Sequence, residues 1–205
     1  MSKLLNFLKN YFIPQSVFLI LVNFFRNNKK TKSVDTFIAS NIKGTTERSL
    51  DIGCGLSISN PFNASELFGV DIRDINSENT FKCDLGVEKM PFEDSFFDSI
   101  SAFDLIEHIP RVVYVGDRKL NPFIFLMDDI CRCLKKDGYF LSHTPAYPSP
   151  AAFQDPTHVN VISFNTYEYY FCDPNYAKNY GFKGKFRLID QAWLGHHLVT
   201  LLQKV

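Results

Sequence analysis

Acidic side chains and a glycine turn stand where short apolar runs of the sequence end. Asp51 lies in the run 49–52, which leads directly into a turn with glycines at 53 and 55. Asp71 closes a second apolar run and Asp84 closes a third. In open parallel sheets, ligands bind beyond the carboxyl ends of the strands, and a carboxylate after the second strand can accept hydrogen bonds from the hydroxyls of a ribose. The pattern therefore predicts a site for a ligand that contains a nucleoside.

The glycine turn departs from two common nucleotide-binding motifs. The dinucleotide motif G-x-G-x-x-G/A needs a third small residue, but Ile58 stands at that position. Segment 56–67 contains Pro61 after Asn60, a capping pair that leaves room for a helix of about two turns and no more. No Lys-Ser/Thr pair follows the turn, which excludes an ATP phosphate loop. Asp71 by itself does not distinguish NAD from S-adenosylmethionine.

Apolar runs alternate with helical or loop segments from residue 49 onward, and this order predicts an α/β domain around a mostly parallel sheet. Segment 121–138 has apolar residues at helical spacing, with Lys135 and Lys136 in its last turn and Gly138 after it, so a helix is expected there. The last two apolar runs lie close together and predict an antiparallel hairpin. The predicted strands are 49–52, 68–72, 80–84, 97–103, 138–144, 186–190 and 197–203.

The composition is that of an ordinary globular protein. The chain has 205 residues, 45% of them hydrophobic and 21% charged, which is enough for one domain with a sizeable core. Its formal net charge is zero, so a polyanionic partner such as nucleic acid is not expected. The five cysteines include no C-x-x-C pair and do not have the spacing of a zinc site. They are interpreted as reduced packing residues of a cytoplasmic protein.

Residues 1–47 are predicted to form a helical N-terminal extension before a domain at 48–205. Two helical patterns lie before residue 27, and a third, at 34–42, ends before Gly44. The stretch 11–25 is apolar, but polar residues and a proline interrupt it and it is shorter than the ~20 residues of a membrane span. It is expected to pack as a helix, with weak peripheral contact to a membrane surface as a further hypothesis.

Five motifs in order resemble those of class I (Rossmann-like) S-adenosylmethionine-dependent methyltransferases, in the branch that acts on small molecules. They are LDIGCG, GVDI, CDL, PFEDSFFDSISAFDLIEHI and LKKDGYFLSHTP. The resemblance covers residues 48–150, with a weaker match at the C-terminal hairpin. It implies a Rossmann-like, seven-stranded, mostly parallel sheet with an antiparallel last strand and helices on both faces. It also implies an enzyme that takes its methyl group from S-adenosylmethionine.

The same resemblance implies which residues hold the cofactor. The glycines of the turn admit the methionine part, and Asp51 positions its amino end. Asp71 holds the ribose hydroxyls, and Asp84 accepts a hydrogen bond from the adenine amino group. The implied cofactor-binding residues are Asp51, Gly53, Cys54, Gly55, Asp71, Ile72, Asp84, Leu85, Ser101 and Phe103.

Histidines beyond the predicted strands are the candidate catalytic residues, because a base must remove a proton from an oxygen or nitrogen acceptor. His143 stands at the ligand edge of the fifth predicted strand. Asp155 and His158 lie in DPTHVN, which resembles a signature of methyltransferases found with bacterial cell-surface polysaccharide enzymes. The expected acceptor is a small molecule such as a sugar or a surface-polysaccharide intermediate. His108 is expected to shape the pocket, and no metal-ligand set is evident.

Other function classes stay open on the sequence alone. An NAD-dependent oxidoreductase is disfavoured by Ile58 and by the short segment after the glycine turn. A non-catalytic module that binds S-adenosylmethionine is disfavoured by the complete set of cofactor residues, although a fold does not establish a function. A methyltransferase acting on RNA is disfavoured by the zero net charge and by AFDL, where many nucleic-acid amino methylases carry Asn/Asp-Pro-Pro-Tyr/Phe.

Overall fold

The computed structural model of the chain describes residues 31–44 and 46–205. The helices predicted before residue 27, and the membrane contact predicted at 11–25, lie outside these residues. The third predicted helix is present as α3 (Val34–Asn41), where the Ser33 side chain accepts a hydrogen bond from the Thr36 amide and caps the first turn. Within the described part of the chain, no helix has the length and apolar character that crossing a bilayer demands.

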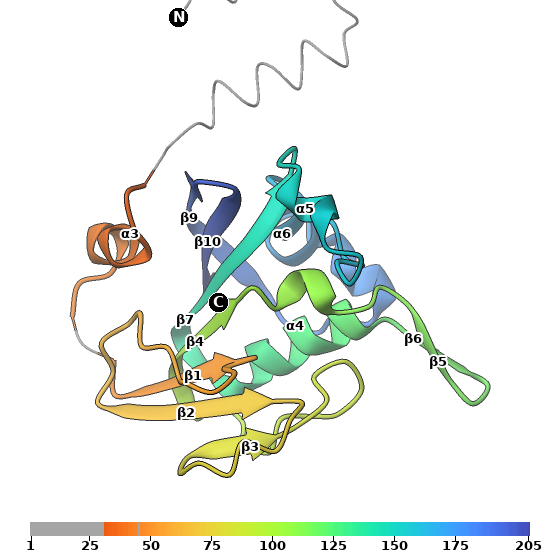
Figure 1. Cartoon of the computed structure of the whole chain (residues 1–205), viewed down its shortest axis with the longest axis horizontal. Coiled ribbons are helices and arrows are strands. Elements are labelled where there is room, and N and C mark those ends of the chain that lie inside the picture. Colours follow the sequence, from red (N-terminus) through yellow and green to blue (C-terminus); the bar gives the residue numbers. More distant parts are fainter. Residues whose placement is uncertain (1–30, 45) are drawn as a thin grey trace, which may run out of the picture. The chain divides into compact units, whose positions relative to one another are not determined.

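The main sheet has the strand order β3-β2-β1-β4-β7-β10-β9 (Figure 1). Strands β3, β2, β1, β4 and β7 run parallel to one another, whereas β10 runs antiparallel to both of its neighbours. This order confirms the predicted Rossmann-like sheet with its antiparallel last strand. A short additional strand, β8, pairs with the end of β7. The strands are β1 (Arg48–Ile52), β2 (Glu66–Asp71), β3 (Thr80–Lys82), β4 (Phe97–Phe103), β7 (Leu134–Tyr147), β8 (Ile162–Ser163), β9 (Phe186–Leu194) and β10 (His197–Lys204).

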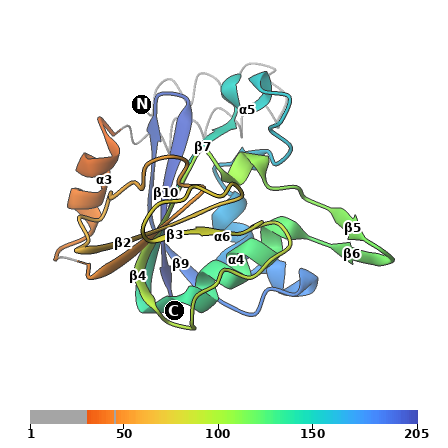
Figure 2. The same ribbon diagram turned by 60° about the horizontal axis from the view of Figure 1, so that its bottom comes forward.

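Helices cover both faces of this sheet, as predicted (Figure 2). On one face, α3 packs Phe37 in a cluster with Leu141 of β7 and with residues of β10. On the other face, α4 (Pro122–Cys133) and α6 (Thr166–Phe171) bury their apolar sides in the larger core. Successive side chains of a strand point to opposite faces, so Phe140 of β7 joins this larger core while Leu141 joins the smaller one.

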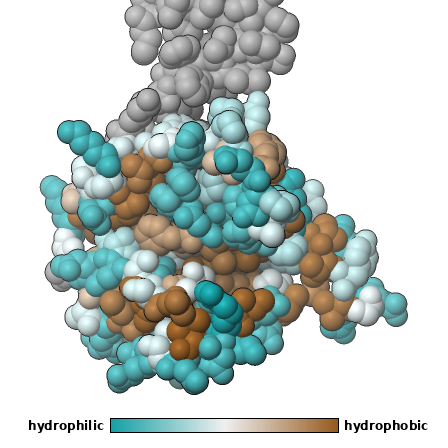
Figure 3. Space-filling view, in the orientation of Figure 1, coloured by the Kyte–Doolittle hydropathy of each residue, from teal (hydrophilic) through white to brown (hydrophobic). Residues whose placement is uncertain are grey.

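Short elements follow the carboxyl ends of β4 and β7. After β4 the chain makes a 3-10 turn and then a hairpin that projects from the sheet in Figures 1 and 2. This hairpin exposes apolar side chains, including Tyr114 and Val115, and brown surface is visible on it in Figure 3. After β7, a short helix and a loop lead to β8 and α6. These elements are η1 (Ile106–His108), β5 (Val113–Val115), β6 (Arg118–Leu120), α5 (Ala151–Gln154) and η2 (Tyr176–Tyr180).

The helix expected at 121–138 is shorter than predicted, because α4 ends at Cys133. The next residue, Leu134, has an extended backbone and pairs with β4 as the first residue of β7. Lys135 therefore lies in the strand, where its Nζ is 2.8 Å from Asp98 Oδ1. Pairing with β4 and this ion pair outweigh the helical pattern of the residues after Cys133. Lys135 and Lys136 therefore do not lie in the last turn of α4.

The two-turn helix predicted within 56–67 is also absent. Asn60 Oδ1 accepts a hydrogen bond from the Ala64 amide at 2.8 Å, and Asn60 Nδ2 donates to Ala64 O at 3.0 Å. Asn63 within this loop has a φ of 53°, a left-handed conformation that a helix does not continue through. Asn60 therefore closes a turn with its side chain, and no helix follows it.

All five cysteines are buried as free thiols. Burial raises the pKa of Cys54 and of Cys83 to about 11, so these thiols are protonated at neutral pH. Their environment is that of packing residues, as the sequence predicted.

Candidate functional site

The glycine turn at the end of β1 packs against the chain that follows β4. Gly53 and Gly55 have positive φ angles of 72° and 60°, which glycine adopts without strain. The Gly53 amide donates a hydrogen bond to Val70 O of β2 at 2.7 Å. A side chain at Gly53 would place its Cβ only 2.9 Å from Leu105 Cδ1. The turn therefore requires glycine at position 53 both for its backbone conformation and for its contact with Leu105.

Asp51, inside β1, is a buried carboxylate with two hydrogen-bond donors. The residue is 2% exposed, its Oδ1 accepts from Ser101 Oγ at 3.0 Å, and its Oδ2 accepts from the Ser59 amide at 2.8 Å. Burial raises the pKa of Asp51 to about 6 despite these hydrogen bonds. No lysine or arginine of residues 31–44 and 46–205 forms an ion pair with it. A cationic group bound beside Asp51 would favour its charged form.

Asp71, at the end of β2, is held by Arg73. The Arg73 Nε lies 2.8 Å from Asp71 Oδ1 and its Nη2 lies 3.1 Å from Oδ2, while the Gly55 amide donates to Oδ2 at 3.0 Å. The hydrogen bonds from Arg73 lower the pKa of Asp71 to about 2. This carboxylate is therefore charged at neutral pH and is tied to the glycine turn. Arg73 was not among the predicted site residues, although a cation two positions after a strand-end acid is a recognisable signal.

The other predicted cofactor residues lie at different depths around the same edge. Ile72 is 61% exposed, whereas Leu85 is buried. Asp84 Oδ1 accepts a hydrogen bond from the Gly86 amide at 3.0 Å, so this carboxylate shapes the turn after β3. The Phe103 ring lies 5.5 Å from the His143 ring, centroid to centroid. The structure brings the predicted residues of β1, β2 and β4 together, and it places Asp84 and Leu85 beyond β3, the strand beside β2.

A cluster of one carboxylate and two imidazoles lies where β4, β7 and β10 meet. Asp104 Oδ1 lies 3.0 Å from His197 Nε2 and 3.5 Å from His143 Nδ1. The two imidazole rings stack with their centroids 4.2 Å apart. Burial would raise the pKa of Asp104, but both histidines outweigh it and lower that pKa. Burial, together with His143, lowers the pKa of His197. Of Asp104 and His197, Asp104 is therefore the charged residue at neutral pH.

A second cluster surrounds η1 on the other side of β7. Glu107 is 1% exposed, and its Oε2 accepts a hydrogen bond from Thr144 Oγ1 at 2.7 Å. Burial raises the pKa of Glu107 above its ordinary value. The rings of His108 and His158 lie 4.9 Å apart, centroid to centroid, in an edge-to-face arrangement. The loop that carries His158 is fixed to η1, because the amides of Val159 and Asn160 both donate to Glu107 O at 2.9 Å.

Asp155 and His158, predicted as a pair, are not joined through their side chains. The Asp155 carboxylate accepts from the Thr157 amide at 2.8 Å and from Thr157 Oγ1 at 2.6 Å. Thr157 Oγ1 in turn lies 3.0 Å from His108 Nδ1. His158 Nδ1 lies 3.1 Å from Ala151 O. The structure therefore connects Asp155 to His108, which was expected only to shape the pocket.

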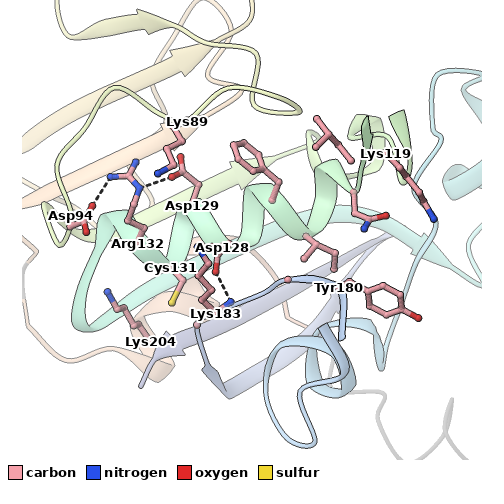
Figure 4. Close-up of a pocket in the computed structure, with 16 residues that line it drawn as sticks. Lys89, Asp94, Lys119, Asp128, Asp129, Cys131, Arg132, Tyr180, Lys183 and Lys204 are labelled. Atoms are coloured by element: carbon pink, nitrogen blue, oxygen red, sulfur yellow. Dashed lines mark hydrogen bonds and ion pairs between the residues drawn. The ribbon is translucent and has the colours of Figure 1, made fainter. Parts of the chain in front are cut away.

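The described residues line two cavities, one beside η1 and one to which neither cluster contributes a residue. One, of about 290 Å³, is lined by polar and aromatic side chains, including Arg111, Asn160 and Tyr170. It adjoins η1, because Asn160 Nδ2 donates to Ile106 O at 3.0 Å. The other, of about 700 Å³, lies along the outer side of α4 (Figure 4). Its Arg132 is already paired with Asp94 and Asp129, and no predicted site residue lines it.

Three residues of the two clusters were missed by the sequence prediction: Asp104, Glu107 and His197. Asp104 and Glu107 belong to AFDLIEH, directly after the fourth strand, so a search for acids just beyond strand ends would have found them. His197 is the first residue of the predicted strand 197–203 and was assigned no role. Its place beside His143 depends on the antiparallel register of β10 against β7, which pairs Val199 with His143, and the sequence does not indicate that register.

Comparisons with known proteins agree with this fold. A family model described as a methyltransferase domain matches residues 22–175. A solved SAM-dependent methyltransferase from Archaeoglobus fulgidus is similar, with a TM-score of 0.52 and 17% sequence identity, over 91% of this chain and 99% of that one. Another, from Aquifex aeolicus, has a TM-score of 0.54 and 13% identity, over 85% of this chain and 90% of that one.

A third structural match is a chain from the complex between the Haloferax volcanii Trm112 methyltransferase activator and a methyltransferase. Its TM-score is 0.56 with 12% identity, over 81% of this chain and 86% of that one. At these identities the structural matches establish a shared fold. No curated protein sequence matches the chain.

Proposed function

Since the chain belongs to the methyltransferase-domain family and uses S-adenosylmethionine as its cofactor, we propose that it methylates an oxygen or nitrogen atom of a small molecule, with a sugar-containing acceptor favoured. Because the chain belongs to this family, the alternative hypothesis of an NAD-dependent oxidoreductase is no longer needed. The observation that carries the proposal is the pair formed by Asp104, directly after β4, and His143 of β7. Hydroxyl and amine acceptors lose a proton when they are methylated, and this pair can take it.

The cofactor would lie across the carboxyl ends of β1, β2 and β4. The buried Asp51 has no cationic partner among the described residues, which suits the amino group of the methionine part. Asp71 is charged and fixed beside the glycine turn, which suits the ribose hydroxyls. Asp84 has one oxygen that accepts no hydrogen bond from the described residues, and this suits the adenine amino group.

In the proposed reaction, the acceptor oxygen or nitrogen attacks the methyl carbon in line with the carbon–sulfur bond. The new bond to the methyl carbon would form as the carbon–sulfur bond breaks. The electron pair of the broken carbon–sulfur bond would stay on sulfur, which gives S-adenosylhomocysteine. The acceptor proton passes to the His143 imidazole. Asp104, 3.5 Å from His143 Nδ1, would stabilise the imidazolium through its negative charge.

The cavity beside η1 lies on the face of β7 opposite to His143, and its lining suits the part of a sugar-containing acceptor that is remote from the methylated atom. Its lining combines Arg111 and Asn160 with the rings of Phe123, Tyr170 and Tyr180. Aromatic faces and planar polar groups are the side chains that bind sugar rings and their hydroxyls. Asp155 and His158 belong to the loop whose Val159 and Asn160 amides donate to Glu107 O. From this loop they would contact the acceptor.

An acceptor screen tests the proposal. The purified chain is incubated with S-adenosylmethionine carrying a labelled methyl group and with nucleotide sugars, free sugars and small amines. We expect S-adenosylhomocysteine to form only when one acceptor class is present, and the label to appear on that acceptor. Transfer of label only to thiols, or only to RNA or protein, would contradict the proposed acceptor while leaving the methyltransferase family intact.

A further inference from the structure

The fold assembles two groups of histidine and carboxylate side chains whose ligand atoms lie within 4.8 Å of one another. The first group is Asp104, His143 and His197. Its imidazole rings stack with their planes only 12° apart. A metal ion binds an imidazole nitrogen in the plane of the ring, at about 2.0–2.1 Å, and two stacked planes share no such point. This group is therefore a charge-paired set around Asp104 and not a metal site.

In the second group, Glu107, His108 and His158, the imidazole planes cross, as they must if one metal ion is to bind both rings. The two imidazole planes meet at 76°, with their centroids 4.9 Å apart. Planes that cross at this angle share a line, and one ion on that line can lie in the plane of both rings. One carboxylate oxygen of Glu107 and one nitrogen of each histidine lie within 4.8 Å of one another.

The hydrogen bonds around both histidines leave the same nitrogen free. His158 Nδ1 lies 3.1 Å from Ala151 O, which can only accept a hydrogen bond, so Nδ1 carries a proton and Nε2 holds the lone pair of the neutral imidazole. Thr157 Oγ1 donates its proton to Asp155 Oδ1 at 2.6 Å, so it accepts from His108 Nδ1 at 3.0 Å. In the neutral imidazole of His108, Nε2 is then also the nitrogen that holds the lone pair. Such partners on the second nitrogen are the usual supports of metal-binding histidines.

The Glu107 carboxylate lacks a cationic side-chain partner. It is 1% exposed, it accepts one hydrogen bond from Thr144 Oγ1 at 2.7 Å, and no lysine or arginine in the described ranges is paired with it. A buried carboxylate without a counter-charge is costly. A dication between Glu107 and the two imidazoles would offset that cost, and Thr144 would orient the carboxylate ligand.

We propose that Glu107, His108 and His158 bind one divalent first-row transition-metal ion. Imidazole together with carboxylate suits ions such as Mn²⁺, Co²⁺ and Zn²⁺. Three protein ligands leave coordination positions open for an oxygen of the methyl acceptor, and a bound ion makes that oxygen more acidic. The role of the ion in methyl transfer rests on the proposed function, whereas the binding of the ion by these three residues does not. Leu105, which precedes η1 and contacts Gly53, places the site next to the predicted cofactor turn.

The site is tested by direct metal binding. Untagged protein, stripped with a chelator, is titrated with Co²⁺ by visible absorption and with Zn²⁺ by calorimetry. We expect one ion to bind per chain. Glu107→Gln, which keeps an acceptor for Thr144, and His158→Ala should each bind at least about tenfold more weakly. His196→Ala is the matched control, because this histidine belongs to neither group, and it should bind as the wild type does.

Two further measurements separate the possible failures. Thr157→Val removes only the hydroxyl that orients His108 and should weaken binding about tenfold without unfolding the chain, as circular dichroism would verify. Absence of saturable binding by the wild type, or equal binding by Glu107→Gln and His158→Ala, would overturn the site. Loss of binding in His197→Ala alone would place the ion in the other cluster and would also overturn it. A chain that binds the ion and S-adenosylhomocysteine but methylates no small molecule would contradict the proposed function and keep the site.

Discussion

The Arg73 guanidinium covers the Asp71 carboxylate with two hydrogen bonds, Nε to Oδ1 at 2.8 Å and Nη2 to Oδ2 at 3.1 Å. The Asp71 side chain is 7% exposed, while that of Arg73 is 60% exposed, so the arginine is the partner that faces solvent. The arginine occupies acceptor positions that the ribose hydroxyls of the cofactor would use. Cofactor binding is therefore expected to exchange the guanidinium for hydroxyl groups at the same carboxylate.

Asp71→Ala should weaken binding of S-adenosylhomocysteine by about 100-fold. Hydrogen bonds to a charged group are worth about 1.5–3 kcal/mol each, and two ribose hydroxyls would lose their acceptor, a loss that is partly offset because Arg73 no longer has to be displaced. Isothermal titration calorimetry measures the change. Asp74→Ala is the matched control, since Asp74 is exposed and accepts only from the nearby Asn76 amide. Equal affinities in Asp71→Ala and wild type would contradict the assignment of Asp71.

Arg73→Ala should destabilise the chain at neutral pH and have little effect near pH 2. The pKa of Asp71 is about 2 in the folded chain and 3.8 for the free group, so its ion pair stabilises the fold above pH 4. That contribution is lost as the pH falls toward 2, because the carboxylate is then protonated. Urea unfolding at several pH values checks this, with Arg118→Ala, an exposed arginine of the β5–β6 hairpin, as the control. A constant difference at every pH would contradict the ion pair.

Cofactor affinity should fall as the pH drops below about 6. Burial raises the pKa of Asp51 to about 6, and the cationic amino group of the cofactor binds the ionised form. Below that pH the proton must leave before binding, which reduces affinity by about tenfold per pH unit. Titrations of S-adenosylhomocysteine between pH 5 and pH 8 test this, and Asp51→Asn should show weaker binding without the pH dependence.

Gly53→Ala should abolish cofactor binding and destabilise the chain more than Gly195→Ala does. Both glycines have positive φ angles, 72° and 60°, so each substitution carries about 1–2 kcal/mol of backbone strain. Only at Gly53 would the new Cβ meet another side chain, Leu105, at 2.9 Å; nothing lies within 4 Å at Gly195. Thermal unfolding and calorimetry separate the two effects. Similar stabilities of the two variants would show that Leu105 moves aside freely.

His143→Ala should lower the rate of methyl transfer by about 10²–10⁴-fold, as expected for loss of a general base. Asp104→Asn should lower it less, because the imidazole remains but loses the negative charge beside it. Neither substitution should change the affinity for S-adenosylhomocysteine. His196→Ala, an exposed histidine whose ring contacts Ser149, is the control with unchanged rate. Rates are measured with the acceptor identified by the screen, and an unchanged rate in His143→Ala would assign the base elsewhere.

The strands and the carboxyl-edge residues were predictable from the apolar runs and from glycine at 53 and 55, whereas the seven-stranded sheet with its antiparallel last strand was implied by the family resemblance. Phe97–Phe103 was predicted with its observed bounds. The end of α4 was not predictable from the local sequence pattern. Lys135 follows the helical spacing, yet pairing with β4 and an ion pair with Asp98 hold it in β7.

The candidate site was predictable where its residues stand next to strand ends and was missed where contacts join distant segments. Asp51 and Asp71 are marked by their position in the sequence. The Glu107–His108–His158 group joins segments about fifty residues apart through the bonds of Val159 and Asn160 to Glu107 O. No spacing rule for metal ligands covers such a distance, so the group becomes visible only in three dimensions.

Strand β7 places His143 and Thr144, neighbours in the chain, on opposite faces of the sheet, one toward Asp104 and the other toward Glu107. A one-residue insertion or deletion within β7 would exchange the two side chains and disrupt both clusters at once. The length of this strand is therefore under a functional constraint as well as a structural one. Variation in acceptor choice among related chains should then be concentrated in the loop after β7 and in the segment between β4 and α4, with β7 keeping its number of residues.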